Sequence, residues 1–281
     1  MRIVFMGTPD FALASLKALV ENNYNVVGVV TVADKPSGRG QKLHQSPVKV
    51  YAESKGIPVL QPLKLKDENF LAELKALQPD LQIVVAFRML PEVVWQLPKY
   101  GTFNLHASLL PNYRGAAPIN WAIINGEKQT GVTTFFIDEK IDTGAIIAQA
   151  VTPIDAHETA GTLHDKLMLQ GADLVLKTVD SIAAGTCTTQ PQNKEITFAE
   201  APKIYKETCK INWEEDGMTI ERLIRGMSPY PTAWAEFPHK GEMLATKVYD
   251  AVFEPATHNE PIGKLLAEKK QLRVAVKDGF I

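Results

Sequence analysis

Short apolar runs alternate with segments of helical periodicity along the first half of the chain, and this alternation restricts the fold more than any other feature. Ile3–Met6 is such a run; Gly7–Asp10 follows it, and apolar residues then recur at helical spacing as far as Val20. Val26–Val32 is a second run, dense in β-branched residues on both faces, as in a strand that is covered on both sides. The alternation predicts right-handed βαβ units and an α/β fold with a doubly wound, mostly parallel, Rossmann-like sheet.

The same reasoning extends along the chain. It predicts helices at 46–54, 70–77 and 119–124, and strands at 57–60, 81–86, 102–106, 132–137 and 145–151. A long helix is expected from Thr159 to Ala183, followed by a polar segment that we expect to cross the surface. Beyond Tyr205, short strands are separated by turns, with one helix near Thr219–Arg225. We therefore expect a first domain over 1–185, a linker over 186–204 and a smaller, mainly β domain over 205–281.

Composition excludes several classes of protein. The 281 residues carry 30 Lys+Arg against 32 Asp+Glu, a net charge of −2, which gives no general reason to expect a nucleic-acid partner. No apolar run approaches the length of a membrane span, and the apolar stretch near Met1 is too short for a signal peptide, so we expect a cytoplasmic protein with no membrane partner. Cys187 and Cys209 form no CxxC pair, which argues against a disulfide framework or a cysteine-rich zinc site.

A doubly wound sheet raises the hypothesis of a dinucleotide site at the turn after the first strand. That turn, Gly7–Ala12, has one glycine where the dinucleotide fingerprint requires three, and Pro9 and Phe11 obstruct a close approach to a pyrophosphate. No P-loop motif is present either. The chemistry must therefore lie elsewhere.

Polar side chains cluster where a predicted strand ends. Asn104 and His106 are two residues apart, so on a strand they project to the same face, at the carboxyl end where open α/β sheets bind ligands. Asp142 lies in an acidic turn after another strand, from which it is able to fold back over the strand ends. A lone histidine or a lone turn aspartate is more often structural, but two proton-handling groups on one face favour a catalytic site.

At these residues the chain resembles the formyltransferases that use 10-formyltetrahydrofolate, and within them the branch that formylates initiator Met-tRNA. The resemblance covers nearly the whole chain and is carried by the segments Val4–Ala12, Asp34–Val50, Asn104–Pro118, Ile141–Gly144, Ile211–Trp213 and Ile224–Met227. The family implies a formyl transfer to the α-amino group of methionine on initiator tRNA, for translation initiation. It also implies an OB-like C-terminal β-barrel domain that binds tRNA.

By this resemblance the catalytic residues are Asn104, His106 and Asp142. Attack of an amine on a formyl carbon develops negative charge on the formyl oxygen, so the site needs hydrogen-bond donors and a route for a proton. The Asn104 amide is expected to donate to that oxygen. A protonated His106 would stabilise it, with Asp142 favouring and orienting the imidazolium. The formyl donor, 10-formyltetrahydrofolate, is a co-substrate, and neither a metal nor a covalent enzyme intermediate is required.

The folate is expected in a slot between loops that follow two neighbouring strands. Flat pterins need stacking and backbone hydrogen bonds, which these loops offer. One departure from the family is Arg88, where a small residue is usual. The predicted folate-binding residues are Phe87, Arg88, Met89, Leu90, Ser108, Leu109, Leu110, Pro111, Ile137 and Asp138.

A basic connection follows the second strand. Between Lys35 and Lys49 it holds four basic residues and no acid, beside the expected site. In the tRNA-specific branch the corresponding insertion enters the acceptor-stem end, so the predicted tRNA-binding residues are Lys35, Arg39, Lys42, Lys206, Lys210 and Arg222. Family members usually continue beyond the position of Ile281, so the C-terminal domain expected here is either truncated or short.

Two alternative functions remain open from the sequence. The first is a formyltransferase that acts on a small amine, such as an amino sugar nucleotide, with the same catalytic residues. The second is a non-catalytic RNA-binding protein of the same fold, against which the complete set Asn104, His106 and Asp142 weighs. We expect a monomer in either case.

Overall fold

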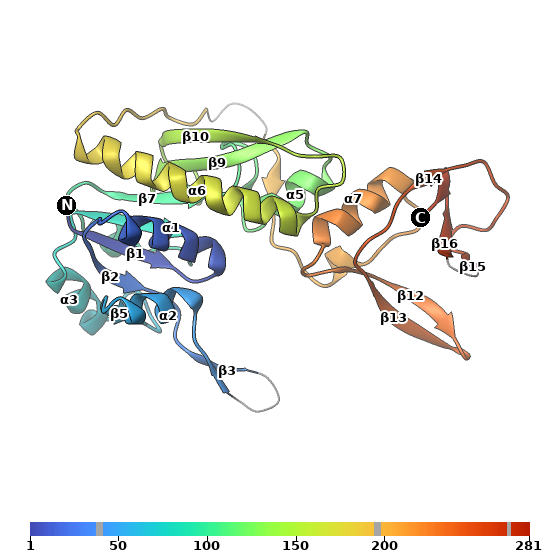
Figure 1. Cartoon of the computed structure of the whole chain (residues 1–281), viewed down its shortest axis with the longest axis horizontal. Coiled ribbons are helices and arrows are strands. Elements are labelled where there is room, and N and C mark those ends of the chain that lie inside the picture. The colour runs from blue at the N-terminus through green and yellow to red at the C-terminus, as the bar shows by residue number, and fades with distance from the viewer. Residues whose placement is uncertain (38–41, 194–197, 269–270) are drawn as a thin grey trace. The chain divides into compact units, whose positions relative to one another are not determined.

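A computed structural model describes residues 1–37, 42–193, 198–268 and 271–281. These residues form two compact units (Figure 1). The first comprises Met1–Arg114, Gly131–Thr152 and Asp165–Ala199, and the second comprises Gly115–Thr130, Pro153–His164 and Glu200–Ile281. Across the described ranges, none of the helices combines the length and the apolar character needed to cross a membrane.

The first unit is built on a seven-stranded sheet with the order β10-β9-β7-β6-β1-β2-β5. The strands β1, β2, β5, β6 and β7 pair in parallel, and β9 pairs antiparallel with β7. The predicted mostly parallel sheet is thus confirmed. The bounds of the strands are β1 Ile3–Gly7, β2 Val26–Val30, β5 Val59–Leu60, β6 Leu81–Val85, β7 Thr102–His106, β9 Gln129–Phe136 and β10 Ile146–Pro153.

Helices connect these strands, and side chains cap the starts of α2 and α3. Ser46 caps α2 by accepting a hydrogen bond from the Lys49 backbone N–H at 3.1 Å, and Pro47 occupies the first helical position. The long helix α6 begins within one residue of its predicted start and ends where predicted. The bounds are α1 Asp10–Glu21, α2 Pro47–Ser54, α3 Glu68–Ala76, α4 Glu92–Trp95 and α6 Ala160–Ala183.

Helices pack against both faces of the sheet. Met6 of β1 lies in one apolar cluster with Leu74 of α3 and Val94 of α4. Because strand side chains alternate, Gly7 points to the opposite face, where a Cβ on it would lie 2.5 Å from the Cβ of Ala12 in α1. The sheet is therefore doubly wound, with the α3–α4 cluster on one face and α1 on the other.

The basic connection between β2 and α2 contains a short antiparallel hairpin of β3 (Lys35–Ser37) and β4 (Lys42–His44). At its base, Asp34 accepts hydrogen bonds from Lys49 Nζ at 2.6 Å and from Gln61 Nε2 at 2.8 Å. The hydrogen bond from Lys49 lowers the pKa of the Asp34 carboxyl, and the same bond raises the pKa of Lys49. The positive charge of Lys49 is thus paired with the carboxylate of Asp34 at the base of the hairpin. The connection therefore carries less unpaired positive charge than the sequence suggests.

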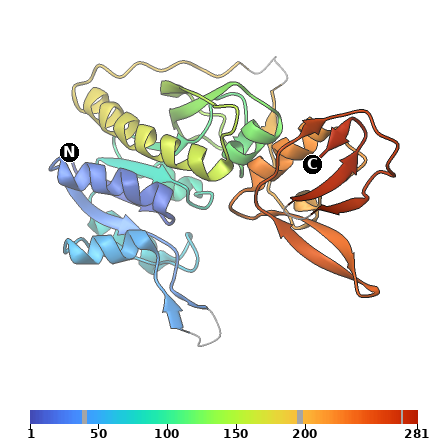
Figure 2. The same cartoon turned by 45° about the vertical axis from the view of Figure 1, so that its right-hand side comes forward.

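The second unit begins with α5 (Pro118–Ile124), which packs on α7 (Gly217–Met227). Its strands form an antiparallel hairpin and a four-stranded antiparallel sheet of order β14-β17-β16-β15 (Figure 2). The bounds are β12 Ala233–His239 and β13 Glu242–Val248 for the hairpin, and β14 Glu254–Pro255, β15 Leu265–Glu268, β16 Gln271–Val276 and β17 Gly279–Phe280 for the sheet.

The core of the second unit collects buried residues of α7 with the start of β12 and the end of β16. Ile220 and Ile224, four apart on α7, lie on one helical face and pack with Ala233 and Val276. The expected smaller, mainly β domain with one helix near Thr219–Arg225 is confirmed, and its strands pair antiparallel. Its strands are distributed between two sheets.

We expect Gly131→Ala to destabilise the first unit. A Cβ at Gly131 would lie 2.1 Å from the carbonyl oxygen of Ala150 and 2.6 Å from a methyl of Leu109, so the backbones of β9 and β10 must separate. The expected loss in the free energy of unfolding is about 2 kcal/mol or more, measured by urea denaturation. Gly185→Ala is the control: it has open space and only a positive φ of 68°, and should cost about 1 kcal/mol. Equal losses in the two variants would contradict this packing.

The Asp34–Lys49 pair predicts a pH-dependent contribution to stability. Because folding lowers the pKa of Asp34, its contribution is complete above the carboxyl's ordinary value of about 4 and is lost as pH falls through the lowered value. Asp34→Asn should therefore lower the melting temperature at neutral pH, and the gap to wild type should narrow in acid. Glu73→Gln, which replaces an exposed carboxylate on α3, serves as the control. A gap for Asp34→Asn that is constant with pH would refute this assignment.

Candidate active site

The carboxyl edge of the parallel strands brings the first two candidate residues into place. The register pairs Gly7 with Val85 and Val85 with Leu105, so β1, β6 and β7 end at the same edge. Asn104 pairs with Val84 and projects to the face that carries the α3–α4 cluster, and His106, two residues on, projects to the same side. The predicted common face of Asn104 and His106 is thus present.

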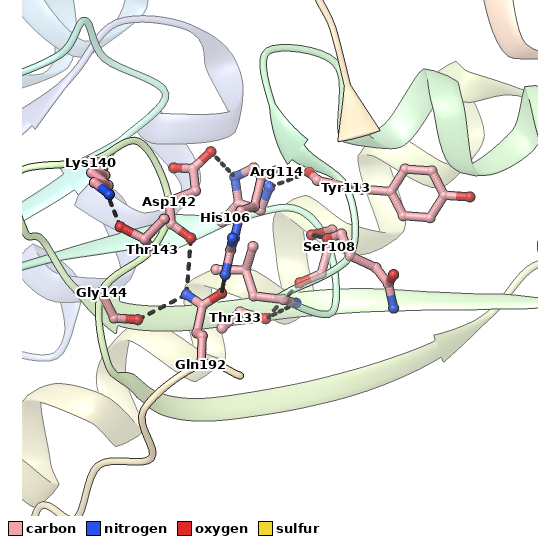
Figure 3. Close-up of polar contacts among 12 residues, drawn as sticks. His106, Ser108, Tyr113, Arg114, Thr133, Lys140, Asp142, Thr143, Gly144 and Gln192 are labelled. Atoms are coloured by element: carbon pink, nitrogen blue, oxygen red, sulfur yellow. Dashed lines mark hydrogen bonds and ion pairs between the residues drawn. The ribbon is translucent and has the colours of Figure 1, made fainter. Parts of the chain in front are cut away.

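The imidazole of His106 is held at one nitrogen and faces a carboxylate with the other. Its Nε2 lies 2.8 Å from the carbonyl oxygen of Tyr113, and because a carbonyl oxygen only accepts, Nε2 carries the proton and donates. Its Nδ1 lies 3.8 Å from Oδ2 of Asp142 (Figure 3). Both side chains are largely buried, at 7% and 12% exposed. The gap at Nδ1 is too long for a direct hydrogen bond and leaves that nitrogen for a third group.

Asn104 presents a buried polar atom that the described residues leave unsatisfied. Its Oδ1 is inaccessible to solvent and has no hydrogen-bond partner among the described residues. Buried polar side-chain atoms are rarely left in this state, because the desolvation is uncompensated. An unpaired amide end beside an imidazole is a property expected of a site that receives a polar group from a ligand.

The Asp142 loop reaches His106 by turning back along the sheet. Because β9 runs antiparallel to β7, Phe136 pairs with Phe103 and the strand ends beside the start of β7. The loop must then return toward the carboxyl edge. Asp138 stabilises this turn by accepting hydrogen bonds from the Lys140 N–H at 3.1 Å and the Thr143 hydroxyl at 2.7 Å.

Two backbone features make the return possible. Asp142 has a φ of 55°, in the left-handed region, which re-aims the chain and the carboxylate. Gly144 lies so close to β9 that a Cβ there would stand 1.6 Å from the carbonyl oxygen of Phe136. The Ile141–Gly144 motif therefore combines the charged group with the glycine that its turn requires.

Side chains of β9 and β10 hold the loop that follows His106. The Thr133 hydroxyl donates to the carbonyl of Ser108 at 2.6 Å and accepts from the N–H of Leu110 at 3.1 Å. Gln149 Nε2 donates to the carbonyl of Leu110 at 2.8 Å. Ser108 Oγ donates to the carbonyl of Asn112 at 2.7 Å. These bonds fix the backbone that carries Tyr113, the partner of His106.

Gln192 and Arg114 join this site although the sequence analysis assigned them no role. The Gln192 side chain, 6% exposed, donates to the carbonyl of Asp142 at 2.9 Å and accepts from Arg114 Nη2 at 2.6 Å (Figure 3). The expectation that its polar segment only crosses the surface is therefore wrong at this residue. A glutamine in a polar stretch has no periodicity or motif that signals such a contact.

The predicted folate-binding residues after β6 fall into different environments. Phe87 is half-buried against the α3–α4 cluster, Leu90 is buried within it, and Met89 is exposed. The exposed Arg88 guanidinium donates to the carbonyl oxygens of Leu63, at 2.9 Å, and Pro62. It is therefore turned to the loop after β5.

The remaining predicted folate-binding residues lie on the loops after β7 and β9. Ser108 and Leu110 are buried, Leu109 and Pro111 are half-buried, and Ile137 packs against the α3–α4 cluster while Asp138 is exposed. The strands that precede the two expected slot loops, β6 and β9, are not neighbours as assumed, because β7 lies between them. The apolar runs that identified them contain no information on strand order.

The predicted tRNA-binding residues lie on two separate parts of the chain. Lys35 is exposed on β3, Lys42 lies in β4, and Arg39 falls outside the described residues. In the second unit, Lys206 and Lys210 both lie over the ring of Trp234, at 5.3 and 5.0 Å from its centroid.

Two of the second unit's predicted tRNA residues also have local partners. Lys210 pairs with Glu236 at 2.7 Å. The Arg222 guanidinium lies against Gly126, where a Cβ would approach it to 2.6 Å. In the described part of the chain, no group of three or more His, Cys, Asp or Glu side chains is arranged to hold a metal ion.

Comparison with known proteins gives matches along the whole chain. The chain is 56% identical over 281 residues to a methionyl-tRNA formyltransferase of Flavobacterium johnsoniae, covering 100% of this chain and 89% of the relative. It is 57% identical over 288 residues to a methionyl-tRNA formyltransferase of Parabacteroides distasonis, with the same coverage.

Among solved structures, the fold is similar to an N-formyltransferase of Helicobacter canadensis in complex with folinic acid and dTDP-3-aminofucose. The TM-score is 0.73 at 24% identity, covering 99% of this chain and 96% of that one. The family described as formyl transferase matches residues 1–179, and the formyl transferase C-terminal domain matches residues 203–281. The chain therefore belongs to the formyl transferase family.

Proposed function

We propose that this protein transfers the formyl group of 10-formyltetrahydrofolate to the α-amino group of methionine on initiator Met-tRNA, for translation initiation. The observation that carries the proposal is the identity of 56% and 57%, over the full chain, to methionyl-tRNA formyltransferases of two bacteria. The geometry of Asn104, His106 and Asp142 supplies the chemistry. A role in translation implies a cytoplasmic location.

Asn104 and His106 would bind the oxygen on which negative charge develops. The unpaired end of the Asn104 amide is buried beside the imidazole, and rotation of the amide about its last bond places either its oxygen or its N–H₂ there. An amide N–H donates without a change of charge, in a site where few waters compete. When bound, 10-formyltetrahydrofolate supplies the activated formyl group.

His106 would hold a proton at Nδ1, since its Nε2 is committed to the Tyr113 carbonyl. An imidazolium presents Nδ1–H toward the space between the ring and Asp142, where it stabilises an oxyanion. The Asp142 carboxylate, 3.8 Å away, would orient that charged form and relay the proton that the attacking amine loses, through a water, to N10 of the departing tetrahydrofolate.

The loops beside this site suit a folate. The side chains of Phe87, Leu109 and Ile137 on these loops are apolar and half-buried, and the buried Oδ1 of Asn104 has no hydrogen-bond partner among the described residues. Such a mixture is typical of pockets for flat, polar-edged ligands. We therefore retain as folate contacts Phe87, Met89, Leu90, Ser108, Leu109, Leu110, Pro111, Ile137 and Asp138, with Arg88 acting through the loop after β5.

The acceptor would be recognised by the basic connection and by the second domain. We propose that the domain over 1–185 is catalytic and that the domain over 205–281 binds tRNA, joined by the linker 186–204. Lys35, Arg39 and Lys42 lie on the connection after β2. In the second domain, Lys206 and Lys210 lie over the ring of Trp234. Arginine and lysine suit both phosphates and exposed base edges.

A small amine is the alternative acceptor. It is favoured by the similarity of the fold to an N-formyltransferase bound to dTDP-3-aminofucose. At 24% identity that similarity shows the fold alone, whereas the tRNA-specific relatives are more than twice as similar in sequence. The basic connection also favours the larger acceptor, because a small amine does not require it.

His106→Ala and Asp142→Asn should each lower the turnover of Met-tRNA formylation by about 100-fold or more, because each removes charge stabilisation that is present in the transition state. Formyl transfer is measured with charged initiator tRNA, and circular dichroism verifies the fold. Glu139→Gln, on the same loop and exposed, is the matched control and should retain wild-type turnover. Near-normal turnover in either site variant would remove that residue from the mechanism.

Arg39→Ala should slow transfer to Met-tRNA by about tenfold or more while leaving transfer to small amines unchanged, because a phosphate or base contact is lost. The ratio of the two rates is the measurement. Lys66→Ala, an exposed basic residue outside the connection, should leave the ratio unaltered. An equal effect of Arg39→Ala on both acceptors, or none on either, contradicts a role of the connection in selecting tRNA.

A further inference from the structure

The side chain of Gln192 uses its full hydrogen-bonding capacity. Its Oε1 accepts from Arg114 Nε at 3.1 Å and Nη2 at 2.6 Å. Its Nε2 donates to the carbonyls of Asp142 at 2.9 Å and Gly144 at 2.8 Å. An amide offers two donors and two acceptor positions, so all four are occupied. A buried, fully satisfied amide of this kind specifies one geometry and makes departures from it costly.

These four bonds connect the backbone on the two sides of the His106 ring. Arg114 directly follows Tyr113, whose carbonyl accepts from Nε2 of the imidazole. Asp142, on the other side, presents its carboxylate to Nδ1. Gln192 therefore ties the loop that orients the imidazole to the loop that carries its charged partner, as Figure 3 shows.

The Asp142 loop requires such a tie. Asp142 adopts a left-handed φ of 55°, a conformation that costs free energy for a residue with a side chain, although aspartate tolerates it better than most residues. Within the turn, the exposed Asp138 accepts hydrogen bonds from Lys140 and Thr143, and the Thr143 hydroxyl also lies 3.3 Å from the carbonyl oxygen of Lys140. The buried bonds to the backbone of Asp142 and Gly144 come from Gln192.

Further contacts hold both the segment of Gln192 and its partner Arg114 in place. Two residues earlier, the backbone of Gln190 exchanges two hydrogen bonds of 2.8 Å with Ile146 at the start of β10. The guanidinium of Arg114 lies over the ring of Phe198, with its central carbon 5.2 Å from the ring centroid. The segment that contributes Gln192 is thus part of the first unit, although its sequence reads as a linker.

We propose that Gln192 is a positioning residue for formyl transfer: by bridging Arg114 and the Asp142–Gly144 backbone it fixes the Asp142 carboxylate opposite Nδ1 of His106. It contacts neither the folate nor the amine. The inference rests on the proposed function for its catalytic readout. Its structural readout, the order of the Asp142 loop, is independent of what the enzyme formylates.

The first test compares Gln192→Met with Gln190→Met in the full-length protein. Methionine keeps the length of the side chain and removes all four hydrogen bonds, so kcat for Met-tRNA formylation should fall about tenfold or more, because a misplaced catalytic group loses that much. The KM values for both substrates should change by less than about threefold, since no binding contact is lost. Gln190, whose side chain is exposed, should give wild-type values.

A second variant keeps the proposal testable if Gln192→Met folds poorly. Gln192→Glu retains the acceptor for Arg114 but has no donor for the two carbonyls, so it should lower kcat as Gln192→Met does. A general loss of stability with equal changes in kcat and KM, or a kcat no lower than in Gln190→Met, overturns the proposal.

The decisive readout is the dependence of the effect on Asp142. If Gln192 acts through that carboxylate, Gln192→Met should cost less than about twofold in kcat when Asp142 is already alanine, because the group it positions is gone.

Independently, amide hydrogen exchange in residues 138–145 should accelerate in Gln192→Met and not in Gln190→Met. Unchanged exchange together with a full effect in the Asp142→Ala background contradicts the proposal, even if the wild type formylates Met-tRNA. A wild type that formylates no acceptor while the exchange responds as expected would refute the function and retain the bridge.

Discussion

The hydrogen bond from Nε2 of His106 to the carbonyl of Tyr113 is the interaction on which the rest of the site depends. A carbonyl oxygen accepts and does not donate, so this bond selects one tautomer and commits one ring nitrogen. The other nitrogen then faces Asp142 across 3.8 Å, a gap that suits a bound group or a water. In the opposite orientation of the ring, Asp142 and the Asn104 amide would not face the same ring nitrogen.

The surrounding structure preserves this arrangement through the backbone of two loops. The loop after β7 is held by Thr133 and Gln149, and the loop after β9 is turned back by Asp138 and by the glycine at 144. Strands end in register, and helices on both faces bury the sheet, so the two loops start from rigid positions. The reactive groups therefore depend on precise backbone contacts more than on contacts between their own side chains.

Much of this architecture follows from the residues alone, and the exceptions have physical causes. Apolar runs and 3.6-residue patterns report burial, which is why β1, β2, β6 and α6 are predicted correctly, and the alternation of side chains along a strand is why Asn104 and His106 are found on one face. An apolar run does not encode the direction or order of a strand, so the antiparallel β9 and the place of β7 between β6 and β9 had to come from the structure. Lys49 reads as a free basic residue until Asp34 is found 2.6 Å away. Gln192 gives no signal, because a hydrogen bond to a backbone carbonyl leaves no pattern in sequence.

The tautomer and environment of His106 are the most direct test of the account, and ¹⁵N NMR of the imidazole in the full-length protein measures both. We expect the neutral ring to carry its proton at Nε2, where it donates to the carbonyl of Tyr113, and Nδ1 to carry none in that form. A neutral ring protonated at Nδ1 and free at Nε2 would contradict this account, because the bond to Tyr113 would then be absent.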